Sequence, residues 1–131
     1  ILWKSQLQSE IALSTTEAEY TGLSYSLRAA IPIMHLLGEM HKNGIKVDTL
    51  PPKITCTVFE DNSGAIEIAK HERLSPRTKH MATKLHHFRH YVDQGLIKII
   101  HCPTKDQQAD LLTKPLPNPQ FASFRRMIMG W

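Results

Sequence analysis

Near the middle of the chain stands the segment Thr57-Val58-Phe59-Glu60-Asp61-Asn62-Ser63-Gly64-Ala65-Ile66. The β-branched and aromatic residues before its polar centre predict a strand over 54–59, and the residues after Asn62 predict a short helix. Asp61 lies where the strand gives way to the turn, a position suited to holding a metal ion or a phosphate. Taken alone, the same carboxylate fits an ordinary helix cap.

Two further carboxylates have comparable settings. Glu19 follows the polar run Ser14-Thr15-Thr16-Glu17, and Asp110 lies in Gln108-Ala109-Asp110-Leu111-Leu112. Hydrolysis of a phosphodiester is assisted by two divalent ions about 3.5–4 Å apart, and magnesium prefers oxygen ligands such as carboxylates. If Glu19, Asp61 and Asp110 converge from separate elements, they can hold Mg²⁺ or Mn²⁺. Spacing alone does not decide between this hypothesis and structural roles for each acid.

The first half of the chain predicts a hairpin remnant followed by a long helix. Residues 1–4 and 11–13 are short strand candidates, close enough in sequence to pair in antiparallel fashion. Ser14 and Glu17 have the spacing of a capping box, so a helix is expected to begin there and run to about Lys42. Pro32 removes a backbone donor inside this helix and predicts a kink or a local break. The expected core-facing stripe comprises Leu23, Leu27, Ile31, Met34 and Leu37.

The second half predicts a helix over 78–94, a strand over 96–101, a helix that carries Asp110 and a terminal helix around 121–129. Thr104 and Gln107 have the spacing of a second capping box before Asp110. Together with the first strands, this order favours a single α/β domain over 1–131, in which a mixed sheet is flanked by helices.

Composition excludes several classes of protein. With 131 residues and 41% hydrophobic content, the chain can bury an ordinary core. No apolar run approaches the roughly 18 residues expected of a membrane helix. The two cysteines, Cys56 and Cys102, lie in apolar runs typical of free buried thiols, which favours an intracellular, reducing location.

Basic residues cluster in one part of the chain although the net charge is only +4. Between Lys70 and Tyr91, six lysines and arginines face the single acid Glu72. Such a segment attracts polyanions in a salt-sensitive manner, and Lys79, Lys84 and Arg89 are the candidate phosphate contacts. The alternative is a solvated basic helix face.

Histidines are also concentrated there, but their spacing is poorly suited to a structural zinc site. Only His86 and His90 stand four apart on a predicted helix. His101, on the late strand, is a weaker candidate for proton transfer. We therefore favour a magnesium centre over a zinc centre.

Five segments together resemble the ribonuclease H domain that closes the Pol polyprotein of copia-type LTR retrotransposons. They occur in that family's order and cover nearly the whole chain. They are Trp3-Lys4-Ser5, residues 12–20, Asp61-Asn62-Ser63-Gly64-Ala65-Ile66, Arg77-Thr78-Lys79-His80 and residues 108–116.

The resemblance implies a ribonuclease H-like fold that cuts the RNA strand of RNA/DNA hybrids with two magnesium ions. By motif, Glu19, Asp61 and Asp110 match three family metal ligands, and residues 77–89 would lie beside the hybrid. The first family aspartate belongs to a strand that precedes Trp3, so the resemblance implies an N-terminally truncated, incomplete domain. We expect such a chain to be weakly active or inactive, and either incompletely folded or completed by a partner. The expected partner is the upstream reverse transcriptase region.

Three function classes remain open at this stage. They are a magnesium-dependent endoribonuclease, a catalytically inactive module of the same fold that binds hybrids, and a structural remnant of the polyprotein. Metal dependence separates the first from the second, and salt-sensitive hybrid affinity separates the second from the third.

Overall fold

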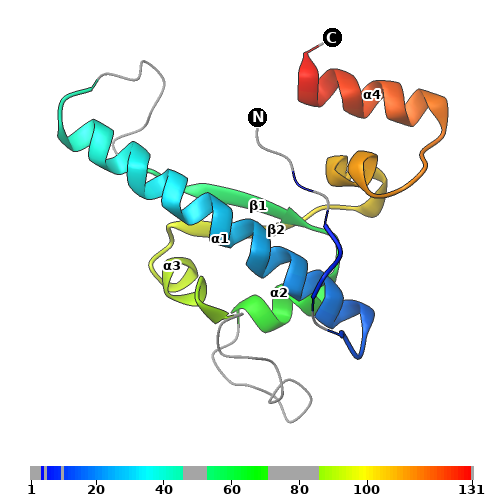
Figure 1. Ribbon diagram of the computed structural model, residues 1–131, viewed down its shortest axis with the longest axis horizontal. Helices are drawn as coiled ribbons and strands as arrows, with labels where there is room; N and C mark the ends of the chain where they lie inside the picture. Colours follow the sequence, from blue (N-terminus) through cyan, green and yellow to red (C-terminus); the bar gives the residue numbers. More distant parts are fainter. Residues whose placement is uncertain (1–3, 5, 10, 46–52, 71–85, 131) are drawn as a thin grey trace.

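The computed structural model describes residues 4, 6–9, 11–45, 53–70 and 86–130. Over these residues the chain is an α/β protein, mostly helical, with a small sheet of two parallel strands (Figure 1). None of the helices described is both long and apolar enough to cross a membrane. The elements are α1 (Thr15–Lys42), β1 (Cys56–Glu60), α2 (Ser63–Lys70), α3 (Arg89–Asp93), β2 (Ile97–His101), the 3₁₀ turns η2 (Thr104–Asp106) and η3 (Gln108–Leu112), and α4 (Asn118–Met129).

Helix α1 begins where the capping pattern predicts. The Ser14 hydroxyl oxygen accepts a hydrogen bond from the Glu17 amide at 3.2 Å. The Glu17 carboxylate reaches back one residue further than a capping box requires, to the Leu13 amide at 2.8 Å. The helix ends at Lys42, and Gly44 follows with a φ of 74°, a left-handed conformation that favours glycine.

Of the kink or local break expected at Pro32, the break is wrong, because α1 continues through this residue, and the kink stays a prediction. Leu27 and Ile31, on the turn before the proline, are buried in the core, with 1% and 7% of their surface exposed. Tertiary packing of an apolar face supplies most of a helix's stability, so the helix tolerates one missing backbone donor.

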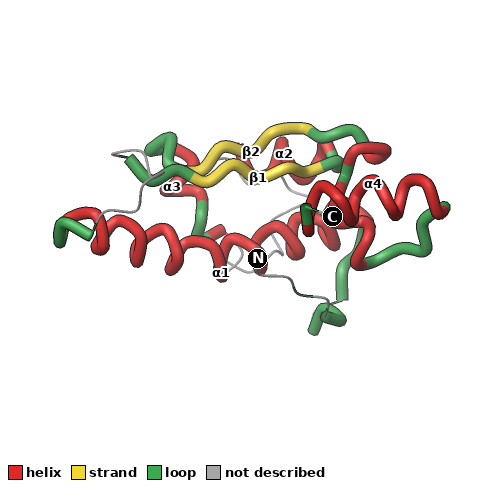
Figure 2. Tube along the Cα trace, turned by 90° about the horizontal axis from the view of Figure 1, so that it is seen from above, coloured by secondary structure: helices red, strands yellow, loops and turns green. Residues whose placement is uncertain are grey.

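Strands β1 and β2 pair in parallel, from Cys56 opposite Ile97 to Glu60 opposite His101. Alternate residues therefore share a face. One face packs against α1 and α2, while the other exposes Phe59 and Ile100. Figure 2 shows α1 running alongside the two strands. The buried core consists of Tyr20, Leu23, Leu27, Ile31, Ala65, Ile66, Ala69, Phe88, Ile97 and Ile99.

The strand predicted at 11–13 is wrong. Ile11 and Leu13 are 93% and 74% exposed and belong to no strand, so the described sheet contains two parallel strands rather than a mixed set. These side chains have no apolar surface to pack against, and an alternating pattern forms a strand only where a sheet receives it. Of the first strand candidate, residues 1–4, residues 1–3 lie outside the described residues and Lys4 belongs to no strand.

Three helices differ from their predicted extent. In the described part of 78–94, α-helix begins only at Arg89, and residues 78–85 lie outside the described residues. Asp110 lies in a 3₁₀ turn rather than an α-helix, because extended Gln107 separates η2 from η3 and no side chain caps either turn. Helix α4 begins three residues early, with Pro119 in its first turn, where a fixed φ suits a helix start.

Candidate metal centre

Three carboxylates meet at the end of the sheet where both strands finish. Figure 1 shows that the first turns of α1 lie near this end. One carboxylate oxygen from each of Glu19, Glu60 and Asp61 lies within 4.8 Å of the other two. The structure thus brings together Glu19 and Asp61, two of the predicted site residues, and adds Glu60.

Glu60 reaches this position because of strand alternation. Cys56, Val58 and Glu60 share the face of β1 that packs toward α1, and Glu60 is the most buried of the three, with 6% of its surface exposed. The amide of Asn62 donates to Glu60 Oε1 at 3.1 Å. Asn62 Oδ1 also accepts from the Ala65 amide at 3.0 Å, which caps the start of α2. Asp61 is therefore held between a strand end and a helix cap.

Burial, together with neighbouring charges, raises the pKa of two of these acids, Glu60 and Glu19. Burial raises the pKa of Glu60 from its ordinary 4.5 to about 7, and the neighbouring Glu19 and Asp61 charges add to this effect. Glu19 is exposed as a residue, but partial burial of its carboxylate, and then the Asp61 charge, raise its pKa as well. Like charges this close are favourable only if a proton or a cation is shared among them.

Asp110 approaches the same cluster from the C-terminal side. It is 8% exposed and forms an ion pair with Lys114, Oδ1 to Nζ at 2.9 Å. Asp110 is not one of the three carboxylates within 4.8 Å, but its charge contributes to the raised pKa of Glu19. The pKa of Lys114 is raised by its hydrogen bond to Asp110, with smaller contributions from Asp61 and Glu19. The ammonium group therefore serves as a partial counter-charge for Asp110, Asp61 and Glu19.

Of the predicted phosphate contacts, Lys79 and Lys84 lie outside the described residues. Arg89 is half-buried, and its Nη2 donates to the Ile68 carbonyl at 2.6 Å. In this structure Arg89 ties α3 to α2. A role for it in nucleic-acid binding stays a prediction.

Sequence reasoning missed Glu60, although a signal for it was present. Cys56, Val58 and Glu60 alternate along a strand, so Glu60 belongs to the same face as two apolar residues, where an unpaired acid is costly. His101, the other candidate for chemistry, is exposed at the end of β2. Among the described residues, the group suited to a metal ion consists of carboxylates alone, with no histidine or cysteine.

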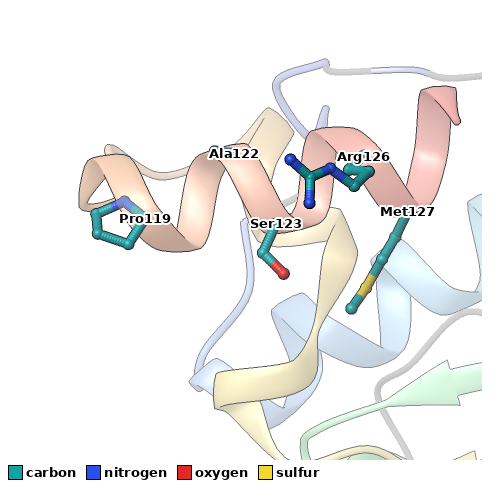
Figure 3. Close-up of a pocket in the computed structure, with 5 residues that line it drawn as sticks. All are labelled: Pro119, Ala122, Ser123, Arg126 and Met127. Atoms are coloured by element: carbon teal, nitrogen blue, oxygen red, sulfur yellow. The ribbon is translucent and has the colours of Figure 1, made fainter. Parts of the chain in front are cut away.

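A separate hollow of about 330 Å³ lies on α4 (Figure 3). It is lined by Pro119, Ala122, Ser123, Arg126 and Met127. All five residues come from α4, whereas the acids come from α1, the end of β1 and η3. The hollow is therefore separate from the carboxylate cluster.

Comparison with known proteins assigns the chain to a class. Over nearly its full length it is homologous to part of the Pol polyproteins of copia-type retrotransposons. It is 37% identical over 128 residues to each of two retrovirus-related Pol polyproteins of Arabidopsis thaliana, from transposons RE1 and RE2. It is 30% identical over 128 residues to the corresponding polyprotein from the tobacco transposon TNT 1-94.

Each of these alignments covers 98% of this chain. The chain spans only 8% to 9% of the length of these curated relatives. No model of a protein family matches the sequence, and no solved structure matches it. The chain therefore corresponds to one small region of a retrotransposon Pol polyprotein.

Proposed function

We propose that this region is the ribonuclease H domain of a retrotransposon reverse transcriptase, an endoribonuclease that hydrolyses the RNA strand of RNA/DNA hybrids by two-metal catalysis. The observation that carries the proposal is the convergence of Glu19 and Asp61, from motifs 42 residues apart, on one carboxylate cluster. Support also comes from the homology to Pol polyproteins and from the order of the ribonuclease H-like motifs. The ribonuclease H-like fold is part of the same proposal.

The residues present fit a magnesium centre. Magnesium prefers oxygen ligands, and the three clustered side chains offer only carboxylate oxygens. We assign Glu19, Asp61 and Asp110 as the metal ligands by motif, and Glu60 as a further acid facing the same space. When bound, Mg²⁺, or Mn²⁺ in its place, would supply an activated water and neutralise charge on the departing oxygen.

The protein's own residues prepare this chemistry. Buried Glu60, with its pKa of about 7, can hold a proton at neutral pH and so limits the repulsion within the cluster. The Lys114 ammonium group orients Asp110 through their ion pair. Asn62 fixes the strand end from which Asp61 projects.

The proposed substrate is an RNA/DNA hybrid, and the proposed partner is the upstream reverse transcriptase region of the polyprotein. Lys79, Lys84 and Arg89 are the candidate contacts to its phosphates. If they bind phosphate, hybrid affinity falls steeply with salt, because each neutralised phosphate releases counterions.

The test is magnesium-dependent cleavage of a labelled hybrid, comparing this chain with one extended upstream by about 30 residues, roughly two strands and a turn. We expect cleavage in the extended form and weak or no cleavage in the shorter one. Asp61→Asn should abolish cleavage in the extended form while leaving hybrid binding largely intact. The matched control is Asp93→Asn, at the exposed end of α3.

Absence of cleavage by both folded forms would contradict the endoribonuclease proposal. Salt-sensitive binding of the hybrid without cleavage would instead identify an inactive binding module. Loss of folding in Asp61→Asn would make Asp61 a structural residue.

A further inference from the structure

The first turn of α1 and the start of α2 meet in a contact beside the carboxylate cluster. The Thr16 hydroxyl donates to Asn62 Oδ1 at 3.4 Å, a long hydrogen bond. The same oxygen accepts from the Ala65 amide at 3.0 Å. One side chain, Asn62, therefore contacts α1 and caps α2.

The absence of a side chain at Gly64 lets the two helices approach this closely. A Cβ atom at residue 64 would lie 2.9 Å from Thr16 Cγ2 and 3.1 Å from Thr16 Oγ1. It would also lie 3.2 Å from Asn62 Oδ1. Any larger residue at this position must push Thr16 or Asn62 away.

The residues that make this contact are close in sequence to each acid of the cluster. Thr16 precedes Glu19 by three residues, so both side chains lie on the same face of α1. Asn62 follows Asp61 directly, and the backbone N–H of Asn62 donates a hydrogen bond to the Glu60 carboxylate. The contact between Thr16 and Asn62 thus joins the turn of α1 before Glu19 to the residue that follows Asp61.

The cluster needs such a restraint because its members repel one another. Negative charges on Glu19 and Asp61 favour separation of α1 from the strand end, and a cation can bridge them only if they stay close. An uncharged contact between Thr16 and Asn62, packed on Gly64, resists the repulsion without occupying any carboxylate oxygen.

We propose that Thr16 and Asn62, packed against Gly64, are positioning residues that hold Glu19 at metal-bridging distance from Asp61 and Glu60. The inference rests on the proposed metal centre and concerns its assembly. Neither Thr16 nor Asn62 needs to contact the metal.

The experiment measures Mn²⁺ binding by electron paramagnetic resonance, with Mn²⁺ alone as the probe. Thr16→Val removes the hydroxyl and should raise the dissociation constant about threefold to tenfold, the range of one net hydrogen bond. Thr16→Ser keeps the hydroxyl and should bind within about twofold of the original chain. Thr15→Val is the matched control, because Thr15 is the exposed neighbouring threonine of the same helix.

A second pair of variants tests the contact by compensation. Gly64→Ala should weaken Mn²⁺ binding, because the new methyl group meets Thr16 Cγ2. Combining it with Thr16→Ser removes that methyl contact and should recover part of the affinity. Unfolding by urea, followed for each variant, shows whether affinity changes while the folded fraction does not. A merely structural contact would not produce recovery of metal affinity at unchanged folded fraction.

Failure of the proposed metal centre can be distinguished from failure of the positioning role alone. If the original chain binds no Mn²⁺ at millimolar concentrations, the proposed metal centre is wrong and the positioning role falls with it. If the original chain binds Mn²⁺ and both Thr16→Val and Gly64→Ala bind equally well, only the positioning role is overturned.

Discussion

The acids come from two regions of the molecule, and each region holds its acids in place in a different way. The body formed by α1, β1, α2 and β2 carries Glu19, Glu60 and Asp61 on elements that share one buried core. The C-terminal segment, residues 104–129, carries Asp110 on a 3₁₀ turn, and the only buried apolar side chain among these residues is Phe124. Three acids are thus positioned by a core, and the fourth by a few local contacts.

A hydrogen bond ties the start of the C-terminal segment to the end of β1. Gln107 Nε2 donates to the Phe59 carbonyl at 3.3 Å. Helix α4 packs chiefly against η3, and Figure 1 shows both beyond the end of the strands. We infer that Asp110 can move relative to the other acids at a smaller cost in free energy than they can move relative to one another.

The largest effect is expected from a substitution that removes part of the core shared by α1, β1, α2 and β2. Leu27 on α1 is 1% exposed and packs in the core cluster. Leu27→Ala should lower the free energy of unfolding by about 3 kcal/mol, since it loses buried apolar surface and leaves a cavity. Urea unfolding followed by circular dichroism measures the loss. The control is Leu36→Ala on the same helix, where the side chain is 60% exposed and a change below about 0.5 kcal/mol is expected.

A second test concerns the buried acid of the body. Because the folded pKa of Glu60, about 7, lies above its ordinary 4.5, its protonated form stabilises the fold below pH 4.5. That stability is lost as the pH rises through 7. Glu60→Gln copies the protonated form, so at pH 8 it should be more stable than the original chain by up to about 3 kcal/mol. At pH 4.5 the two chains should be nearly equal.

Urea unfolding at several pH values, without divalent ions, measures the difference between the two chains. Glu67→Gln, on the exposed side of α2, is the matched control, because it makes the same change of side chain at an exposed position. A constant difference across pH 4.5 to 8 for Glu60→Gln would show that Glu60 titrates normally. Glu60 would then not be desolvated in the cluster.

The contrast between the regions also explains which predictions from sequence succeeded. The start of α1, the short helix after Asn62 and the strand ending at His101 were predicted because capping residues and apolar periodicity are local signals. The break at Pro32 was wrongly predicted, because the core contacts of Leu27 and Ile31 outweigh a local defect. The strand at 11–13 was wrongly predicted, because a strand needs a neighbour that its own sequence does not specify.

For the candidate site too, local signals could be read from the sequence, and features that depend on tertiary packing could not. Glu19, Asp61 and Asp110 were chosen from motifs, and the meeting of the first two depends on the crossing of α1 and the strand end. Glu60 was not among the predicted site residues, and its 6% exposure results from tertiary packing of the β1 face that it shares with Cys56 and Val58. Asp110 was placed on an α-helix because the capping pattern gives no information on the extended Gln107 that interrupts it.

The C-terminal segment and the body should unfold independently of each other. Phe124 is 4% exposed and lies outside the main core cluster. Phe124→Ala should lower the local stability of α4 and η3 by about 2 kcal/mol, less than a core phenylalanine, because a thinly packed segment can close around the gap. Amide hydrogen exchange should quicken in α4 and stay unchanged in α1, and Phe121→Ala, at a 41% exposed position, should change neither. Faster exchange in α1 as well would mean that the two regions unfold as one unit and that Asp110 is held as firmly as the other acids.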